Sequence, residues 1–122
     1  MEYDQARSAK LAQEPAMLQF MEWLRENGAI FPKVEYPACF SGVNGCLVTE
    51  EIASNEAILY IPNKLIISEQ GARESEIAEI FQNHDNLFVG NVDRDHNVLC
   101  TFVMFERLKG PQSFWHPYFE TV

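Results

Sequence analysis

The most regular spacing of apolar residues lies near the start of the chain. Four apolar side chains recur at intervals of three and four residues, which places them on one face of an α-helix: Met17, Phe20, Met21 and Leu24. Pro15 suits the first turn of such a helix, and Gly28 suits its end because glycine readily adopts the left-handed backbone conformation. The pattern predicts a helix from about residue 15 to residue 27.

Short apolar runs follow this helix and are too brief to form another. Their β-branched and aromatic residues favour strands in three places: residues 34–36, 46–48 and 57–61. Gly42 and Gly45 predict a turn before the second run, and Pro62 ends the third. We therefore expect short strands joined by turns after residue 33.

Helical spacing returns in the second half of the chain. Ser68 is placed to cap a short helical turn, and the spacing of Ile77, Ile80 and Phe81 predicts a helix near residues 74–82. The stretch from Gln82 to Asn97 is rich in Asn, Asp and His, which favours a surface loop.

A mostly apolar segment then predicts a buried helix over residues 97–109, with Asp95 or Asn97 as its cap and Gly110 as its stop. Ser113 is expected to cap a last short turn that Pro117 limits. The aromatic residues of that turn, Phe114 and Trp115, are expected in the core because large rings stabilise a small domain when buried.

The mixture of helices and short strands predicts an α+β fold. Residues 1–13 are polar with a few small apolar residues, so we expect a flexible leader or a frayed helix there. Residues 14–122 are then expected to form one domain or part of one, because 122 residues with 47% hydrophobic content suffice for a single core.

The net charge of the chain argues against nucleic acids and anionic membranes as binding partners. Its net charge of −9 repels nucleic-acid phosphates and anionic lipids. No run approaches the roughly 20 apolar residues that cross a bilayer. We expect a soluble intracellular protein, in the cytoplasm or nucleus, that does not bind nucleic acid directly.

The residues that most often carry chemistry form no recognisable site. The three cysteines lack Cys-x-x-Cys spacing and are expected to be buried or partly buried thiols: Cys39, Cys46 and Cys100. The three histidines lack metal-site spacing: His84, His96 and His116. Asp93-x-Asp95-x-Asn97 resembles the start of a calcium loop, but Val98 stands where such a loop needs glycine and Met104 where it needs glutamate. We predict no catalytic residue and no metal site.

Two sequence blocks, in this order, carry a resemblance to a known family. The first contains Gly42–Ile52 and Tyr60–Leu65, and the second is Phe105–Phe119 with its Phe-Trp-x-Pro-Tyr motif. From about Phe20 onward the chain resembles the N-terminal part of SET-domain protein methyltransferases of the Rubisco large-subunit methyltransferase and actin histidine methyltransferase type. The resemblance implies an incomplete SET domain with short β-strands and flanking helices.

The resemblance also implies a cofactor and a reaction. Family members transfer a methyl group from S-adenosyl-L-methionine to a lysine, or in one branch a histidine, of a protein. The turn that contacts the cofactor through its backbone corresponds here to Gly42, Val43 and Asn44. The usual family pattern is Gly-x-Gly, and Val43 replaces its first glycine. An Asn83-His84 dipeptide is present, but it precedes the Phe-Trp-x-Pro-Tyr motif, whereas the cofactor-binding Asn-His of the family follows it.

Two functions are consistent with these observations. The first is the N-terminal portion of a protein methyltransferase that is inactive alone and needs a companion chain or a C-terminal half. The second is a non-catalytic SET-like subunit that serves a structural or interaction role.

Overall fold

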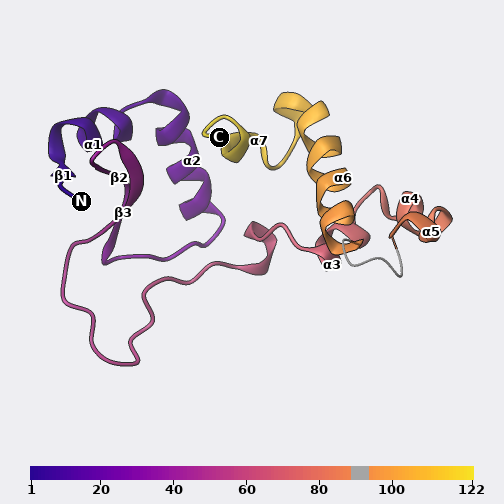
Figure 1. Cartoon of the computed structure of the whole chain (residues 1–122), viewed down its shortest axis with the longest axis horizontal. Coiled ribbons are helices and arrows are strands. Elements are labelled where there is room, and N and C mark those ends of the chain that lie inside the picture. Colours follow the sequence, from indigo (N-terminus) through magenta and orange to yellow (C-terminus); the bar gives the residue numbers. More distant parts are fainter. Residues whose placement is uncertain (89–93) are drawn as a thin grey trace. The chain divides into compact units, whose positions relative to one another are not determined.

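The computed structural model describes residues 1–88 and 94–122, and its elements are labelled in Figure 1. Its contacts divide the chain into two compact units. The first comprises residues 1–65 with Thr121, and the second comprises residues 66–120 with Val122. The first unit contains a small antiparallel sheet, the described residues of the second are helical, and the predicted α+β fold class is confirmed.

The sheet of the first unit has three antiparallel strands in the order β1-β2-β3. Their bounds are Tyr3–Asp4 for β1, Val34–Phe40 for β2 and Val43–Val48 for β3. The predicted strands at 34–36 and 46–48 are therefore confirmed, and each extends further toward the turn that joins them. A register shift between Glu35 and Ala38 interrupts the pairing of β2 with β3. Central strand β2 contributes the buried residues Ala38 and Cys39 to the core.

Residues 1–13 contain β1 and helix α1 (Gln5–Ala12), in the segment for which the sequence suggested a flexible leader or a frayed helix. Asp4 caps α1 by accepting a hydrogen bond from the backbone N–H of Arg7 (2.9 Å). Ser8 is buried on this helix, where its Oγ donates to the carbonyl of Asp4 (2.6 Å) and accepts from the backbone N–H of Cys39 (2.8 Å). The Ser8 hydroxyl thus links α1 to the central strand β2. The composition of residues 1–13 did not indicate this contact.

Helix α2 (Pro15–Glu26) confirms the helix predicted from apolar spacing. Met17 and Met21 are buried, and the Phe20 ring lies 6.5 Å from that of Tyr36 on β2 in an edge-on arrangement. Gly28 follows the helix with a φ of 92°, a conformation that favours glycine.

The predicted strand at residues 57–61 is wrong. In this segment only Tyr60 is paired, through an isolated antiparallel bridge in which Ile30 and Tyr60 exchange two backbone hydrogen bonds of 2.9 and 2.8 Å. The next hydrogen-bonded pairs of that ladder would join residues 32 with 58 and 28 with 62. Pro32 and Pro62 have no backbone N–H to donate, so the ladder cannot extend in either direction.

After a short 3₁₀ turn η1 (Asn63–Leu65), the second unit contains six helical elements in its described residues: α3 (Glu69–Arg73), α4 (Ala78–Asn83), α5 (Asp85–Phe88), α6 (Arg94–Leu108), the 3₁₀ turn η2 (Gly110–Gln112) and α7 (His116–Phe119). The Oγ of Ser68 accepts a hydrogen bond from the N–H of Gly71 (3.1 Å), which confirms the predicted cap of α3. The helix expected near residues 74–82 is present as α4, which begins four residues later than predicted.

The core of the second unit is formed by apolar residues from α3 to α6, with Phe81 and Phe88 in an edge-to-face contact at 5.0 Å. Its buried members on these helices and the segments between them are Ala72, Ile77, Phe81, Phe88, Val98 and Phe102, and Trp115 and Phe119 are the buried apolar residues beyond α6. Ile80 shares the predicted spacing but is exposed. The short helices therefore pack by a few large side chains rather than by long apolar stripes.

The surface loop predicted from Gln82 to Asn97 is wrong where the structure describes it. The end of α4, all of α5 and the start of α6 fall in this stretch, while residues 89–93, including Asp93 of the calcium-like pattern, lie outside the described residues. Asp95 and Asn97 lie inside α6, which begins at Arg94, and not at the position before its first residue. Polar composition misled the prediction because Phe88 anchors α5 in the core while its polar neighbours face outward.

Helix α6 is buried on one face only, in contrast to the prediction. Val98, Phe102 and Glu106 are buried, whereas Met104 and Leu108 are 67% and 87% exposed. Beyond α6, the Oγ of Ser113 accepts from the N–H of Trp115 (3.1 Å), but Pro117 lies in the first turn of α7 and does not end the turn before it. Trp115 is buried as predicted, whereas Phe114 is exposed.

Candidate functional site

The turn that joins β2 to β3 consists of Ser41 and Gly42. Their φ angles are 48° and 87°, and two successive positive φ angles are the mark of a type I′ hairpin turn, whose twist matches that of the strands. The turn expected from the glycine spacing at positions 42–45 is therefore one residue earlier and shorter, because Val43 to Gly45 already belong to β3.

Ser41 is fixed by two hydrogen bonds to the segment before β1. Its backbone N–H donates to the carbonyl of Glu2 (2.9 Å), and its Oγ accepts from the backbone N–H of Glu2 (3.0 Å). A non-glycine residue at positive φ is unusual and needs such support from its surroundings. The N-terminal residues thus help to hold the turn.

At position 43, where the family pattern has glycine, the backbone conformation is one that valine readily adopts. The non-glycine residues with positive φ in the described chain are Ser41 and Asn55, so Val43 occupies an ordinary strand conformation. Its side chain is 61% exposed. The replacement of glycine by valine therefore adds a small apolar side chain beside the turn without straining it.

The hydrogen-bonding direction of Asn44 follows from its partner on β2. Asn44 pairs with Cys39, and the N–H of Cys39 points away from β3, toward Ser8 on α1. Cys39 and Asn44 are therefore a non-hydrogen-bonded pair, and the N–H and C=O of Asn44 point to the outer side of β3. No fourth strand covers that side in the described residues. Next to the turn, β3 thus presents one backbone donor and one backbone acceptor of Asn44 at its exposed edge.

The other chemistry-bearing residues form no catalytic or metal cluster in the described parts of the chain. No group of three His, Cys, Asp or Glu side chains is positioned to bind a metal ion there. Cys100 and His96 are neighbours on α6, with Sγ and Nε2 3.4 Å apart. Cys39 is buried as expected, but Cys46 and Cys100 are exposed, because they lie on the outward positions of an edge strand and of a helix buried on one face only.

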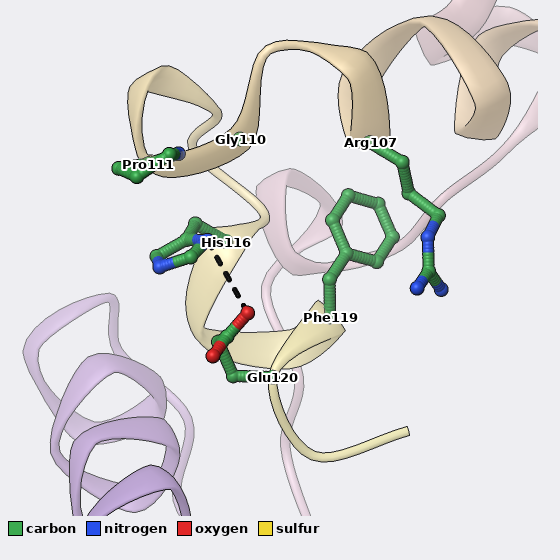
Figure 2. Close-up of a pocket in the computed structure, with 6 residues that line it drawn as sticks. All are labelled: Arg107, Gly110, Pro111, His116, Phe119 and Glu120. Carbon is green, nitrogen blue, oxygen red and sulfur yellow. Dashed lines mark ion pairs between the residues drawn. The ribbon is translucent and has the colours of Figure 1, made fainter.

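A pocket in the second unit was not indicated by any sequence motif. It has a volume of about 310 Å³ and is lined by Arg107, Gly110, Pro111, His116, Phe119 and Glu120. Figure 2 shows Glu120 facing His116, with the Phe119 ring lying toward Arg107. The Nδ1 of His116 is 3.9 Å from Oε1 of Glu120, and the Arg107 guanidinium is 5.4 Å from the centroid of Phe119. The pocket contains both signs of charge, and residues predicted for the cofactor turn are not among its lining.

Comparison with known proteins identifies relatives of the chain. It is 33% identical over 109 residues to the actin-histidine N-methyltransferase of Xenopus tropicalis, and these residues are 85% of the chain and 17% of the relative. It is 30% identical over 104 residues to the proteins of the same name from Homo sapiens and Rhinolophus ferrumequinum, over 84% of the chain and 16% of each relative. The chain is a homologue of part of the actin-histidine N-methyltransferases.

The resemblance to the actin-histidine N-methyltransferases that the sequence blocks indicated is thereby confirmed. The chain spans about one sixth of the length of these curated relatives. No protein-family profile matches the chain. Within the described residues, every helix is too short or too polar to cross a bilayer.

Proposed function

We propose that the chain forms the cofactor-proximal N-terminal portion of a protein methyltransferase that uses S-adenosyl-L-methionine. The observation that carries this proposal is that about 85% of the chain aligns with an actin-histidine N-methyltransferase, at 33% identity. In this proposal residues 14–122 are the N-terminal portion of a SET-like domain, preceded by the short strand and helix of residues 1–13. The acceptor is a lysine or a histidine of a protein, and the compartment is intracellular.

Gly42, Val43 and Asn44 are proposed to contact the cofactor through their backbone. S-Adenosyl-L-methionine carries an ammonium group, which needs hydrogen-bond acceptors, and a carboxylate, which needs donors. The outward C=O and N–H of Asn44 supply one of each. Gly42 leaves the approach open, because no atom beyond Gly42 and its two neighbours in the chain lies within 4 Å of where a Cβ would stand on it. The types of group at this turn therefore fit the types of group on the cofactor.

In this proposal the residues of the chain bind and orient the cofactor. The cofactor, when bound, supplies the methyl group from its sulfonium, and transfer requires an enclosed channel that aligns the acceptor nitrogen with that methyl group. The Ser41–Gly42 turn and β3 form one open edge of the sheet, and one edge cannot enclose such a channel. We therefore propose that further polypeptide completes the channel and supplies the catalytic residues, and that the chain alone is inactive.

The test measures binding of the cofactor by calorimetric titration. S-Adenosyl-L-methionine is titrated into the chain alone, and into the chain mixed with the remaining part of the Xenopus tropicalis relative. Asn44→Pro removes the outward N–H, and proline is tolerated on an edge strand where that N–H faces solvent. Asn44→Ala is the matched control, since it changes the side chain and keeps the backbone groups.

We expect Asn44→Pro to weaken binding at least about tenfold, because a hydrogen bond to a charged group contributes roughly 1.5–3 kcal/mol. Asn44→Ala should bind like the parent chain. Equal affinity of the proline variant and the parent would contradict the proposed contact. Binding in the mixture but not to the chain alone would support the need for further polypeptide.

A second function is favoured by a separate observation. Ile58, Leu59 and Tyr60 are 47%, 55% and 61% exposed and lie next to each other, which is typical of a surface that binds protein. If the folded chain binds no cofactor either alone or in the mixture, a non-catalytic interaction subunit is the better interpretation.

A further inference from the structure

Three side chains of the kinds that bind soft metal ions lie on one exposed face of α6. They follow one another at intervals of four residues, which places them on the same side of the helix in successive turns: His96, Cys100 and Met104. All three are exposed to solvent. The buried residues Val98 and Phe102 lie close to the opposite side of the helix. The three side chains are therefore not needed to pack the core.

The first two of these side chains are already spaced to share one metal ion. The Sγ of Cys100 lies 3.4 Å from the Nε2 of His96. In tetrahedral zinc sites the metal–sulfur and metal–nitrogen bonds are about 2.3 and 2.0 Å long, so two such ligands of one ion lie about 3.5 Å apart. As a hydrogen bond the same contact is weak, because a thiol is a weak donor and both side chains reach water. Its geometry suits a shared ion better.

Met104 supplies a third ligand from the next turn of the helix. Side chains on a helix lean toward its N-terminus, so Met104 leans toward Cys100. An unbranched methionine side chain with three rotatable bonds can bring its thioether sulfur to an ion held by that thiol. The described residues contain no metal-binding group of three His, Cys, Asp or Glu. Methionine is not one of those four residue types, so this set is of a different kind.

We propose that His96, Cys100 and Met104 bind one Cu(I) ion. Thiolate and thioether sulfur are soft ligands that select Cu(I), and imidazole nitrogen also binds copper. The thiol of Cys100 releases its proton when the copper–sulfur bond forms. Zinc sites use cysteine, histidine and carboxylates, so the thioether of Met104 is the ligand that favours copper. The net charge of −9 also favours the approach of a cation.

The test is an anaerobic titration of Cu(I) into the full chain, in competition with the chelator bicinchoninate, whose copper complex is coloured. Cys100→Ser should weaken Cu(I) binding at least about 100-fold, because loss of even an outer-shell partner of a metal site costs 10–100-fold. Cys46→Ser is the matched control at an exposed cysteine on β3 and should bind like the parent chain. Met104→Leu, which keeps an apolar side chain, should weaken binding at least about tenfold.

Alkylation of the thiols gives a second measurement on the parent chain, so the proposal stays testable if a variant fails to fold. Iodoacetamide labelling is followed by mass spectrometry at each cysteine. A thiolate bound to a metal is no longer free to attack, so Cu(I) should slow labelling of Cys100 at least about tenfold. Labelling of Cys46 should be unchanged. Equal protection of the two cysteines would contradict a site on α6.

A parallel titration with Zn²⁺ tests the choice of metal. We expect Zn²⁺ to bind more weakly than Cu(I), with an affinity that does not change in Met104→Leu. Three results would overturn the proposal: equal Cu(I) affinities of Cys100→Ser and Cys46→Ser, a Cu(I) affinity that Met104→Leu leaves unchanged, or tighter binding of Zn²⁺ than of Cu(I).

This inference does not depend on the proposed function. Helix α6 belongs to the second unit and the turn at residues 42–44 to the first, and the copper titration contains no S-adenosyl-L-methionine. Asn44→Pro should leave copper binding unchanged, and Cys100→Ser should leave cofactor binding unchanged. Failure of one proposal is therefore distinguishable from failure of the other.

Discussion

Ser113→Ala tests how strongly the end of α6 is tied to the turn that follows it. Ser113 and Glu106 are each 5% exposed. The Oγ of Ser113 donates to Oε2 of Glu106 (2.6 Å) and accepts from the N–H of Trp115 (3.1 Å). Lys109 donates to the other oxygen of the same carboxylate (2.9 Å). Alanine at position 113 would leave a buried carboxylate oxygen and a buried N–H without these partners.

The size of the effect follows from those two bonds. A hydrogen bond to a charged group contributes roughly 1.5–3 kcal/mol, and one between neutral groups contributes about 1 kcal/mol. Both groups are buried, so water cannot easily replace the lost partner. Ser113→Ala should therefore lower the free energy of unfolding of the second unit by about 2–4 kcal/mol.

The assay is urea unfolding followed by tryptophan fluorescence. The chain has two tryptophans, and replacing Trp23 by Phe leaves Trp115 as the only reporter, which lies in the second unit. Ser75→Ala is the matched control, because Ser75 is half-buried and its Oγ donates to the carbonyl of Ala72 (2.6 Å) with no charged partner. We expect the control to lose about 1 kcal/mol. A loss below about 0.5 kcal/mol for Ser113→Ala would refute the reasoning.

Two further predictions concern the first unit. Gly42→Ala should lower the free energy of unfolding by about 1–2 kcal/mol, because alanine disfavours a φ of 87°. Gly45→Ala is the control, since its Cβ would make an ordinary 3.6 Å contact with Phe40, and it should destabilise the chain less in thermal denaturation. Equal losses for the two variants would argue against a strained turn. The hydrogen bond from Lys33, followed by that from the N–H of Ala53, lowers the pKa of Glu56 below its ordinary value of 4.5, so this contribution to stability is present above pH 4.5 and is lost as pH falls through the lowered pKa. Glu56→Gln should remove that acid-dependent part in a pH series of denaturation curves, and parallel curves for variant and parent would contradict the assignment.

Elements that depend on nearby residues could be predicted from the sequence. The apolar spacing of α2, the cap of α3 by Ser68 and the presence of a turn before β3 all rest on contacts within a few residues. Local preferences decide such elements, so their presence was predicted and only their bounds shifted.

Elements that depend on distant residues could not. Residues 57–61 have strong strand propensity, but pairing on one side is stopped by Pro32, which lies 25 or more residues earlier in the chain. Helix α5 was missed because the burial of Phe88 against other helices outweighs the polar residues around it. In both cases tertiary context overrides local preference.

Some features of the candidate site could be predicted from the sequence, and others depend on contacts between distant residues. The positions Gly42, Val43 and Asn44 came from the resemblance, and the glycine spacing placed a turn nearby. The outward direction of the Asn44 backbone depends on the hydrogen bond between Cys39 and Ser8, 31 residues apart, and no local pattern reveals such a bond. The pocket around His116 and Phe119 likewise depends on how α6 and α7 pack.

The link between Ser8 and Cys39 also sets an order of events during synthesis. A ribosome makes the N-terminus first, yet Ser8 cannot accept its hydrogen bond, nor β1 pair with β2, until residues 39 and 40 have emerged. The β2–β3 hairpin closes over only two turn residues and needs no such wait. The first eight residues of the chain are thus made first, but Ser8 stays without its partner on β2 until 31 further residues have been made.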